Sequence, residues 1–458
     1  MFGIDSIVLN TEVTIKGWVA NIRKTGSLLF LIMRDRDITL QSLALKKELG
    51  NDVFNSLKKT SVESYIELTG KFVDSQVKIE SCTIQHMEFS IHGYRILSNA
   101  QDLPFNIADA NNSFKYDNDK EKLRINVTQK TRLDNRWVDL RCYNNQLIMR
   151  CKSNLCKTLR DILHTKEFTE IFTPKLTGTA SEGGADVYET MHFGTKAYLA
   201  QSPQLYKQMC INGGMGKVFE IAPIFRRDNS ISKRHLSEYI GIDLEMELIR
   251  DADGKYTHMY VVNTTWDMLY SVFSLFGEQK DTKSLFEKLE TSPPVVPKEP
   301  CVITFEDGVK MLNNAGYDQK HNEDLNTENE HILGELVRDK TGSDLFVLTE
   351  YPKNTRPFYT CPHSTDPEKT LSFDIILRGN EISSGARRIN NYNMLLNSLI
   401  DHNLDPDNLK GYTDSFRHGS PPHGGCGFGL ERIVMLYFNL ANVKRVATFP
   451  RDPKRLFP

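Results

Sequence analysis

The sequence predicts an α+β protein in which a small N-terminal β-barrel precedes a larger domain built on a mainly antiparallel sheet with flanking helices. In the first hundred residues, short runs of alternating apolar and polar residues are broken by glycines, as in a barrel. A long helical pattern starts near residue 144, and the rest of the chain alternates strand-like runs with loops. At 458 residues the chain is too long for one ordinary hydrophobic core.

The composition indicates a globular protein of the reducing cytosol. Charged residues make up 25% of the chain, no apolar run is long enough to span a membrane, and the N-terminus lacks the pattern of a signal peptide. The 8 cysteines form no CxxC pair, so we expect neither a zinc site nor a disulfide framework. The net charge of −2 does not by itself indicate a nucleic-acid partner, although a local basic patch could still bind one. We therefore expect a cytoplasmic protein.

Residues 1–100 contain five strand-like runs, which we place at 12–23, 27–35, 38–45, 64–73 and 82–97. The helix-like segment KKELGNDVFNSLKK separates the third run from the fourth. This order matches an OB-type barrel, which is a common platform for single-stranded nucleic acid. The polar stretch 101–132 is expected to be a linker or hinge. Residues 133–458 are expected to form the second domain, with a small helical insertion at about 250–340.

The second domain opens with a helix in NNQLIMRCKSNLCKTLRDILHTKEF. Its apolar residues recur at helical spacing and are Leu147, Ile148, Cys151, Leu155, Leu159 and Ile162. Two further helical stretches are expected near YVVNTTWDMLYSVFSLFGE and TFEDGVKMLNNAG, and strand-like runs lie around them. The domain is therefore predicted to be α+β with a mainly antiparallel sheet.

A charged segment follows, in which 217–227 and 238–248 are predicted to pair as strands around a polar loop. The charged and aromatic side chains expected to share one face are Arg226, Tyr239, Asp243 and Glu245. An arginine fork matches phosphate oxygens, an aromatic ring accepts a base, and carboxylates bind an ammonium or a metal. A solvated surface hairpin is the alternative, and this segment alone does not exclude it.

Two later segments repeat this chemistry. In SFDIILRGNEISSGARRI, Asp374 and Glu381 are separated by a turn, and paired oxygen ligands suit a Mg²⁺ that also holds phosphates. A surface salt-bridge cluster is the alternative for that segment. In HGGCGFGLERIVMLYFNL, a glycine-rich strand leads into a helix that begins near Leu430, with Arg432 in its first turn. Glycines there would let a ligand approach the backbone closely.

Together these segments resemble the three signature motifs of class II aminoacyl-tRNA synthetases. The first helix with FTEIFTPKL resembles motif 1, FRRDNS…RHLSEYIGIDLEME resembles motif 2, and GFGLERIVML resembles motif 3. A barrel ahead of that domain resembles the aspartyl, asparaginyl and lysyl group. Within the group, SEGGADVYET, LAQSPQLYKQM, ISSGARRI and FPRDPKRL resemble the aspartyl members of the archaeal and eukaryotic cytosolic type. The resemblance implies an OB-fold anticodon-binding domain followed by a class II catalytic domain.

The resemblance also implies an ATP-dependent, AMP-forming ligase. It would convert L-aspartate, ATP and Mg²⁺ to aspartyl-adenylate and pyrophosphate, and then transfer the aspartyl group to the 3′-OH of tRNA(Asp). Because an anion attacks an anion, arginines and Mg²⁺ would offset the repulsion. Two basic residues, Lys207 and Arg388, suit a carboxylate better than an amide or an ammonium. We expect no membrane or DNA partner, and by resemblance a homodimer with Pro174 at its interface.

Each residue of the site takes its role from the resemblance. Aspartate would be bound by Glu182, Gln204, Lys207, Arg226, Asp243, Ser384 and Arg388. ATP would be bound by Arg226, Asp228, Arg234, His235, Leu236, Tyr239, Glu381, Gly429 and Arg432. Catalysis would depend on Arg226, Glu381 and Arg432, and Mg²⁺ would be held by Asp374, Glu381 and Ser384. In the barrel, the anticodon would be contacted by Phe30, Gln41 and Glu88, although the apolar run around Phe30 also fits barrel core.

Three alternatives stay open at this point. An asparaginyl enzyme differs in whether Lys207 and Arg388 meet an amide or a carboxylate. A binding module without catalysis would have lost its ATP and metal positions, whereas Arg226, Glu381 and Arg432 are all present. An ATP-dependent amide-forming enzyme on the same catalytic fold would not need the anticodon residues of the barrel.

Overall fold

The computed structural model describes residues 8–115, 126–179, 187–229 and 232–457. These residues belong to two compact units, Met1–Gln146 and Leu147–Pro458. Within the described parts of the chain, no helix is long and apolar enough to cross a membrane.

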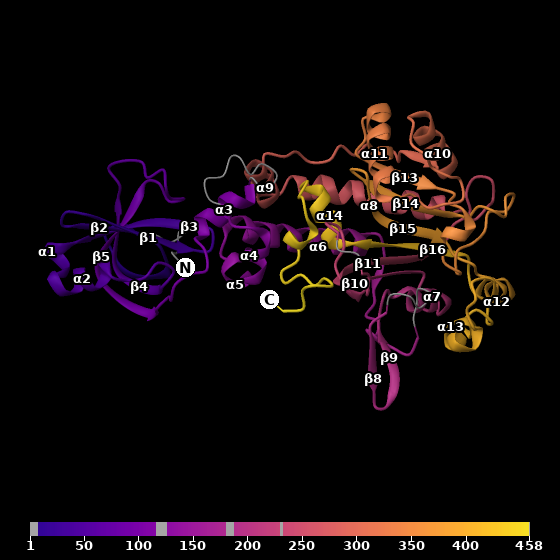
Figure 1. Ribbon diagram of the computed structural model, residues 1–458, viewed down its shortest axis with the longest axis horizontal. Coiled ribbons are helices and arrows are strands. Elements are labelled where there is room, and N and C mark those ends of the chain that lie inside the picture. Colours follow the sequence, from indigo (N-terminus) through magenta and orange to yellow (C-terminus); the bar gives the residue numbers. More distant parts are fainter. Residues whose placement is uncertain (1–7, 116–125, 180–186, 230–231, 458) are drawn as a thin grey trace. The chain divides into compact units, whose positions relative to one another are not determined.

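The first unit contains a closed barrel with the strand order β1-β2-β3-β5-β4 (Figure 1). Its strands are β1 (Glu12–Thr25), β2 (Leu28–Asp35), β3 (Ile38–Leu45), β4 (Tyr65–Asp74) and β5 (Met87–Ser98). Strands β3 and β5 pair in parallel, and the other neighbours pair in antiparallel fashion. Helices α1 (Lys46–Leu49) and α2 (Asn51–Lys58) lie between β3 and β4. The five strands and the intervening helical segment are therefore confirmed.

The barrel core is filled from alternate positions of each strand. On β2, Leu29, Leu31 and Met33 are fully buried, whereas Phe30 between them is only partly buried and is not part of the core cluster. Because side chains along a strand alternate between its two faces, Phe30 points away from the barrel interior. The interpretation of Phe30 as barrel core is therefore wrong.

The polar stretch expected to be a linker is largely helical where the structure describes it. It contains α3 (Ile107–Lys115) and α4 (Gln129–Asp134), and α5 (Arg136–Asp139) follows. Ala110, Val127 and Cys142 are buried together in a small cluster of their own. The domain boundaries inferred from the sequence, at residues 100 and 132, stay predictions.

The second unit is built on an eight-stranded sheet with the order β12-β13-β14-β15-β16-β11-β10-β6 (Figure 1). Its strands are β6 (Thr169–Glu170), β10 (Lys217–Phe225), β11 (Glu238–Glu247), β12 (Val302–Thr304), β13 (Leu345–Thr349), β14 (Ser372–Leu377), β15 (Asn380–Arg387) and β16 (His423–Gly429). Only the end pairs β12–β13 and β10–β6 are parallel among the described strands of this sheet. The mainly antiparallel sheet is confirmed.

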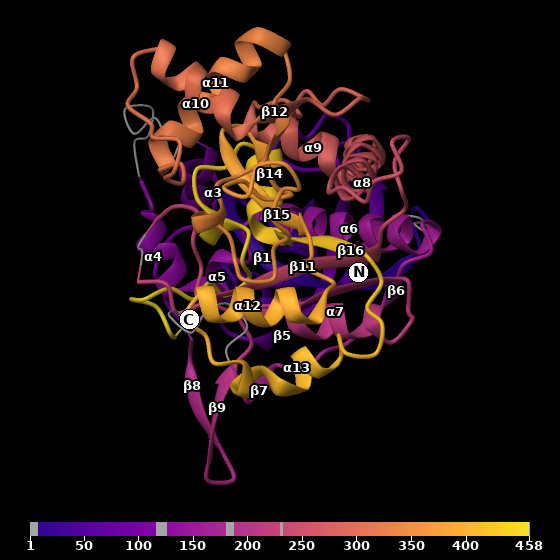
Figure 2. The ribbon, with the colours of Figure 1, turned by 90° about the vertical axis from the view of Figure 1, so that its right-hand side faces the viewer.

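A smaller sheet of β7 (Leu176–Thr177), β9 (Thr195–Leu199) and β8 (Glu189–His192) projects from this unit as a hairpin (Figures 1 and 2). The helices are α6 (Tyr143–Thr165), α7 (Gln204–Asn212), α8 (Met259–Gly277), α9 (Lys280–Leu289), α10 (Phe305–Asn314), α11 (Thr327–Thr341), α12 (Tyr392–Asp401), α13 (Lys410–Asp414) and α14 (Leu430–Tyr437). Helices α6, α8, α10 and α14 match the four helices expected from the sequence. The apolar stripe of α6 ends on buried Leu163 rather than on Ile162, which is only partly buried.

Strand β11 lies near the middle of the sheet and is covered on both faces, with α8 on one side of the sheet and α7 on the other (Figure 2). Its apolar residues, such as Leu244, share a face with Cys426, which contacts Thr265 of α8. On the other face, Asp243 is 6% exposed and Glu245 is fully buried. The solvated-hairpin alternative is therefore wrong, and the carboxylates of this strand belong to the interior.

Candidate active site

One cavity of about 290 Å³ opens above strands β11 and β16. The predicted site residues that line it are Gln204, Arg226, Asp228, Arg234, His235, Leu236, Tyr239, Asp243, Glu381, Ser384, Gly429 and Arg432. These residues come from segments more than two hundred positions apart, and the antiparallel register of β10, β11, β15 and β16 brings them together.

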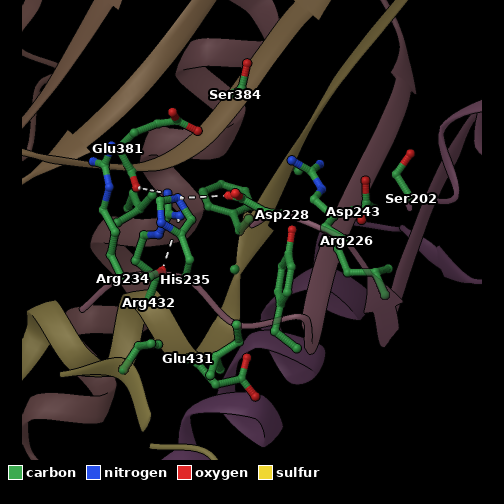
Figure 3. A pocket seen from close by; sticks show the side chains of 18 of the residues that line it. Ser202, Arg226, Asp228, Arg234, His235, Asp243, Glu381, Ser384, Glu431 and Arg432 are labelled. Atoms are coloured by element: carbon green, nitrogen blue, oxygen red, sulfur yellow. Dashed lines mark hydrogen bonds and ion pairs between the residues drawn. The ribbon is translucent and has the colours of Figure 1, made fainter. Parts of the chain in front are cut away.

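The cavity has two chemically different ends. Figure 3 shows Arg234, His235, Glu381 and Arg432 gathered at one end, and Arg226, Asp243 and Ser202 at the other. The sequence assigned the first group mainly to ATP and placed Arg226 and Asp243 beside the amino acid. The arrangement agrees with that division, although the individual roles stay predictions.

Behind the Asp243 end lies a buried lysine. Lys207 of α7 is 1% exposed, and its Nζ donates to Asp243 Oδ1 at 3.0 Å and to the carbonyl oxygen of Cys426 at 3.3 Å. Asp243 itself lines the cavity, so it can receive a cationic group of a ligand while Lys207 fixes its orientation. Lys207 does not line the cavity and acts on its contents through Asp243.

A second buried ion pair stands beside the first. Arg388 Nε donates to Glu245 Oε1 at 2.9 Å and Nη2 to Oε2 at 3.3 Å, and Lys207 Nζ lies 3.4 Å from the same carboxylate. Burial disfavours the charge of Glu245, but Arg388 and Lys207 outweigh it and lower the pKa of this carboxyl. Conversely, Glu245 raises the pKa of Arg388 against the effect of burial. The two cations predicted to suit a carboxylate ligand thus have their own buried counter-ions.

Gly425 makes room for this ion pair. A Cβ atom at this position would collide with the backbone oxygen of Leu244 and with the carboxylate of Glu245. The glycine-rich sequence of β16 therefore serves the packing of a charged pair as well as access to the cavity.

Gln204 connects the ion pair to the cavity. Its Oε1 accepts from Arg388 Nη2 at 3.4 Å, while its buried Nε2 has no hydrogen-bond partner among the described residues. An unpaired buried amide donor costs free energy unless a ligand satisfies it. Gln204 lines the cavity, so its amide is an unused donor at the edge of the space that a ligand would fill.

At the other end, three residues are tied together through their backbones and side chains. Arg432 Nη1 donates to the carbonyl oxygen of Glu381 at 2.8 Å, and its Nη2 lies 3.5 Å from the carbonyl oxygen of Arg234. Nearby, burial and the charge of Arg432 lower the pKa of His235, whose Nδ1 lies 2.6 Å from Ser232 Oγ. This end is rich in cationic donors, which suits an anionic ligand.

Tyr239 and Arg432 lie on either side of Gly429. A Cβ atom placed on Gly429 would be 3.7 Å from the Tyr239 ring and 3.7 Å from Arg432 Cβ. Burial raises the pKa of Tyr239, so its hydroxyl stays neutral. An aromatic ring and a guanidinium beside a glycine that lines the cavity can bind a flat base by stacking.

Of the predicted Mg²⁺ ligands, Glu381 and Ser384 line the cavity, and their binding of the ion stays a prediction. Burial raises the pKa of Glu381 to about 7, and the nearby carboxylate of Asp374 adds to this rise, so a cation there would relieve the crowding of negative charge. Among the described residues, no group of three His, Cys, Asp or Glu side chains is arranged as a metal site. Phosphate oxygens and water would have to complete the coordination shell, as is usual for Mg²⁺.

Asp374, the third predicted metal ligand, does not line the cavity. Its two oxygens accept from Arg356 at 2.8 and 2.7 Å, and Arg356 Nη1 also donates to Ser384 Oγ at 2.9 Å. Asp374 raises the pKa of Arg356 despite burial, and the guanidinium stacks 3.5 Å from the centre of the Tyr351 ring. In this structure the Arg356 guanidinium occupies the place that a metal ion would take beside Asp374. The role of Asp374 as a metal ligand stays a prediction.

In the barrel, Gln41 Nε2 donates to Glu88 Oε1, and the guanidinium of Arg23 lies 5.1 Å from the centre of the Phe30 ring. The three predicted anticodon residues therefore lie on the barrel, where Phe30 faces outward and Gln41 and Glu88 provide polar groups. Their contacts with RNA stay a prediction.

Two further predicted residues have no established role in the structure. Glu182 lies outside the described residues, and Pro174 is exposed between β6 and β7. Other cavity residues were not identified from the sequence, and these are Ser202, Ile224, Ile382, Gly427, Phe428, Glu431 and Val443. Glu431 could have been suspected, since it neighbours Arg432, but its carboxylate accepts from the backbone N–H of Ile240 rather than facing a ligand.

Comparison with known proteins identifies the family. Residues 128–453 match the model of class II tRNA synthetases (D, K and N), and residues 13–96 match an OB-fold nucleic acid binding domain. A probable cytoplasmic aspartate–tRNA ligase of Encephalitozoon cuniculi is 39% identical, over 97% of this chain and 94% of that protein. The cytoplasmic aspartate–tRNA ligase of Homo sapiens is 38% identical, over 97% of this chain and 88% of that protein.

Solved structures agree with this result. The aspartyl-tRNA synthetase of Entamoeba histolytica is 34% identical, with a TM-score of 0.86 over 98% of this chain and 90% of that one. The asparaginyl-tRNA synthetase of Pyrococcus horikoshii, complexed with asparaginyl-adenylate, is 27% identical, with a TM-score of 0.83 over 98% and 96%. With its OB-fold barrel and with residues of motifs 2 and 3 around one cavity, the chain belongs to the class II tRNA synthetases of the aspartyl, lysyl and asparaginyl group.

Proposed function

We propose that this synthetase activates L-aspartate with ATP to give aspartyl-adenylate and pyrophosphate, and then transfers the aspartyl group to the 3′-OH of tRNA(Asp). The curated relatives, which match nearly the whole chain, are named for aspartate. The observation in the site that supports aspartate is the unpaired Nε2 donor of Gln204, held beside the buried guanidinium of Arg388.

Together, Gln204 and Arg388 favour a carboxylate over an amide. Both carboxylate oxygens of aspartate can accept hydrogen bonds, one from the Gln204 amide and one from the Arg388 guanidinium. The side-chain NH₂ group of asparagine is itself a donor, so it would face one of these two donors and leave that donor unpaired. Asp243, oriented by Lys207, takes the α-ammonium of the amino acid. The same arrangement does not suit lysine, because its side-chain ammonium would face Arg388.

The remaining residues position ATP for in-line attack. The α-carboxylate of aspartate attacks the α-phosphorus, the bond to the bridging oxygen of pyrophosphate breaks, and no general base is required because the attacking oxygen carries no proton. Arg226 lines the cavity at its Asp243 end, and we assign it to bridge the carboxylate and the α-phosphate. Arg234 and His235 provide donors for the terminal phosphates, and Tyr239 and Arg432 provide the two groups that stack on the adenine. Glu381 and Ser384 would hold Mg²⁺, whose positive charge would offset that of the phosphates.

We also propose that the barrel binds the anticodon through Phe30, Gln41 and Glu88, since stacking on an outward-facing ring is the usual basis of single-stranded RNA recognition. The cytoplasmic names of the relatives support a cytoplasmic location. A homodimer that includes Pro174 is proposed from the motif 1 resemblance, and sedimentation of the purified protein tests it.

Charging of tRNA tests the proposed function. Purified enzyme is incubated with ATP, Mg²⁺ and transcripts of tRNA(Asp) or tRNA(Asn), with labelled aspartate, asparagine or lysine. We expect aspartate to be transferred to tRNA(Asp). Transfer of asparagine or lysine, or of none of the three, would contradict the proposal, and aspartate transfer to tRNA(Asn) would show a broader tRNA choice.

A further inference from the structure

Glu330 does not line the cavity, yet its carboxylate contacts two segments that do. It lies in the first turn of α11 and is 6% exposed. Its Oε2 accepts from Arg234 Nη1 at 2.7 Å, and its Oε1 accepts from the backbone N–H of Glu381. One buried carboxylate thus connects the loop after β10 to the start of β15.

The position of this carboxylate is set by backbone packing. A Cβ atom on Gly334 of α11 would lie 2.7 Å from the backbone nitrogen of Gly379, which has a φ of +65° in the turn between β14 and β15. A Cβ atom on Gly379 would lie 2.8 Å from Cα of His331. Helix and turn are in direct backbone contact, so Glu330 cannot shift relative to β15 without breaking that contact.

The first turn of α11 also binds the second terminal nitrogen of the Arg234 guanidinium. Arg234 Nη2 donates to Thr327 Oγ1 at 2.9 Å, so both terminal nitrogens of the guanidinium are bound to α11. A guanidinium has five N–H groups, and two are used here, which leaves donors for a ligand. Arg234 belongs to the long connection between β10 and β11, so without α11 its side chain would have to be ordered by the ligand itself.

We propose that Glu330 is a positioning residue that holds the Arg234 guanidinium in place for the terminal phosphates of ATP. Ordering a long side chain before the ligand arrives lowers the cost of binding. The inference rests on the proposed function, which assigns this end of the cavity to ATP. It gives helix α11, outside the three sequence motifs, an indirect part in nucleotide binding, through Arg234.

The variant Glu330→Gln separates the two contacts of the carboxylate. The amide oxygen can still accept from the Glu381 N–H, but the amide nitrogen then faces the Arg234 guanidinium, donor against donor. In ATP–pyrophosphate exchange with aspartate, we expect the KM for ATP to rise about tenfold, with little change in the KM for aspartate or in the Tm without ligand. The control is Glu335→Gln, an exposed residue of the same helix that pairs with His331.

A double-variant cycle shows whether the effect passes through Arg234. If it does, Glu330→Gln adds little to Arg234→Ala, so the double variant has the KM for ATP of Arg234→Ala alone. A wild-type KM for ATP in Glu330→Gln, a lower one, or additive effects in the double variant would overturn the inference. A general rise in both KM values with a lowered Tm would also overturn it, since it would indicate a merely structural role. Wild-type protein without exchange activity would instead contradict the proposed function.

Discussion

The buried carboxylate of Glu245 is the counter-ion on which the amino-acid end of the cavity depends. It pairs with Arg388 through both oxygens, lies 3.4 Å from Lys207 Nζ, and is fully buried. We therefore predict that Glu245→Gln leaves the buried guanidinium of Arg388 with neutral acceptors only, the new amide oxygen and Gln204 Oε1. Removing one partner of a buried ion pair costs about 3–5 kcal/mol, and the remaining amide acceptor places this variant near the lower end, at about 3 kcal/mol.

A loss of about 3 kcal/mol lowers the folding equilibrium constant by roughly 100-fold, because each 1.4 kcal/mol is a factor of ten. For a unit of this size it corresponds to a fall in Tm of about 6 °C. Urea denaturation and thermal unfolding of the unliganded enzyme measure both quantities. The matched control is Glu247→Gln, at the exposed end of the same strand, which should stay within about 0.5 kcal/mol of wild type.

The ligand response distinguishes a functional ion pair from a structural one. If Arg388 binds the side-chain carboxylate of aspartate, a non-hydrolysable aspartyl-adenylate analogue supplies the missing anion in Glu245→Gln. The analogue should then raise the Tm of the variant by more than it raises that of wild type, and the asparaginyl analogue should not. Equal responses to the two analogues, or a smaller aspartyl response in the variant, would refute this reasoning.

Three other predictions concern separate parts of the molecule. Burial lowers the pKa of His258 from an ordinary 6.5 to about 4. As the pH falls, the unfolded state therefore takes up this proton before the folded state does. The contribution of neutral His258 to stability is complete above pH 6.5 and is lost as the pH falls toward 4. Between pH 7 and pH 5, the free energy of unfolding from urea titrations should therefore fall less in His258→Phe than in wild type. Gly425→Ala forces a Cβ onto the backbone oxygen of Leu244 and should lower the free energy of unfolding by several kcal/mol in the same titrations. Gly178→Ala, which has open space around it, should not lower the free energy of unfolding in this way. Equal stabilities of the two variants would contradict the packing argument. Phe30→Ala should raise the KM for tRNA by about 5- to 100-fold, equivalent to about 1–3 kcal/mol of lost stacking, and should leave ATP–pyrophosphate exchange unchanged. A matching loss of exchange would contradict this prediction, since it would show that the substitution damages the catalytic unit.

Local periodicity predicted the secondary structure that positions the site. Alternation over 238–248 placed Asp243 and Glu245 on one face of a strand, and the structure confirms that strand as β11. The same alternation did not reveal that both faces are covered, because burial of the polar face depends on α7, which packs there from elsewhere in the chain. The pairing of Glu245 with Arg388 joins residues 143 positions apart, on β11 and directly after β15, and no local pattern in the sequence encodes it.

Asp374 illustrates the limit of inference from residue type. From the sequence, the carboxylate of Asp374 near Glu381 was interpreted as a metal ligand. In the structure, Arg356, which lies in a loop between strands β13 and β14, donates to both oxygens of Asp374. Nothing in YPKNTRPFYT marks that arginine as its partner. In the stretch 101–132, the polar residues likewise masked the few apolar residues that form a small core with α3, whereas its role as a linker stays a prediction.

Amino-acid-dependent ATP–pyrophosphate exchange tests the central claim most directly, because it requires only the cavity, ATP and Mg²⁺, without tRNA. Wild-type enzyme is compared with aspartate, asparagine and lysine at equal concentrations, together with Arg388→Gln, in which the charge of the buried guanidinium is lost. We predict exchange with aspartate alone, and a loss of most of that exchange in the variant. Exchange with asparagine in the wild type, or an Arg388→Gln enzyme that activates aspartate normally, would contradict the proposed basis of amino-acid choice.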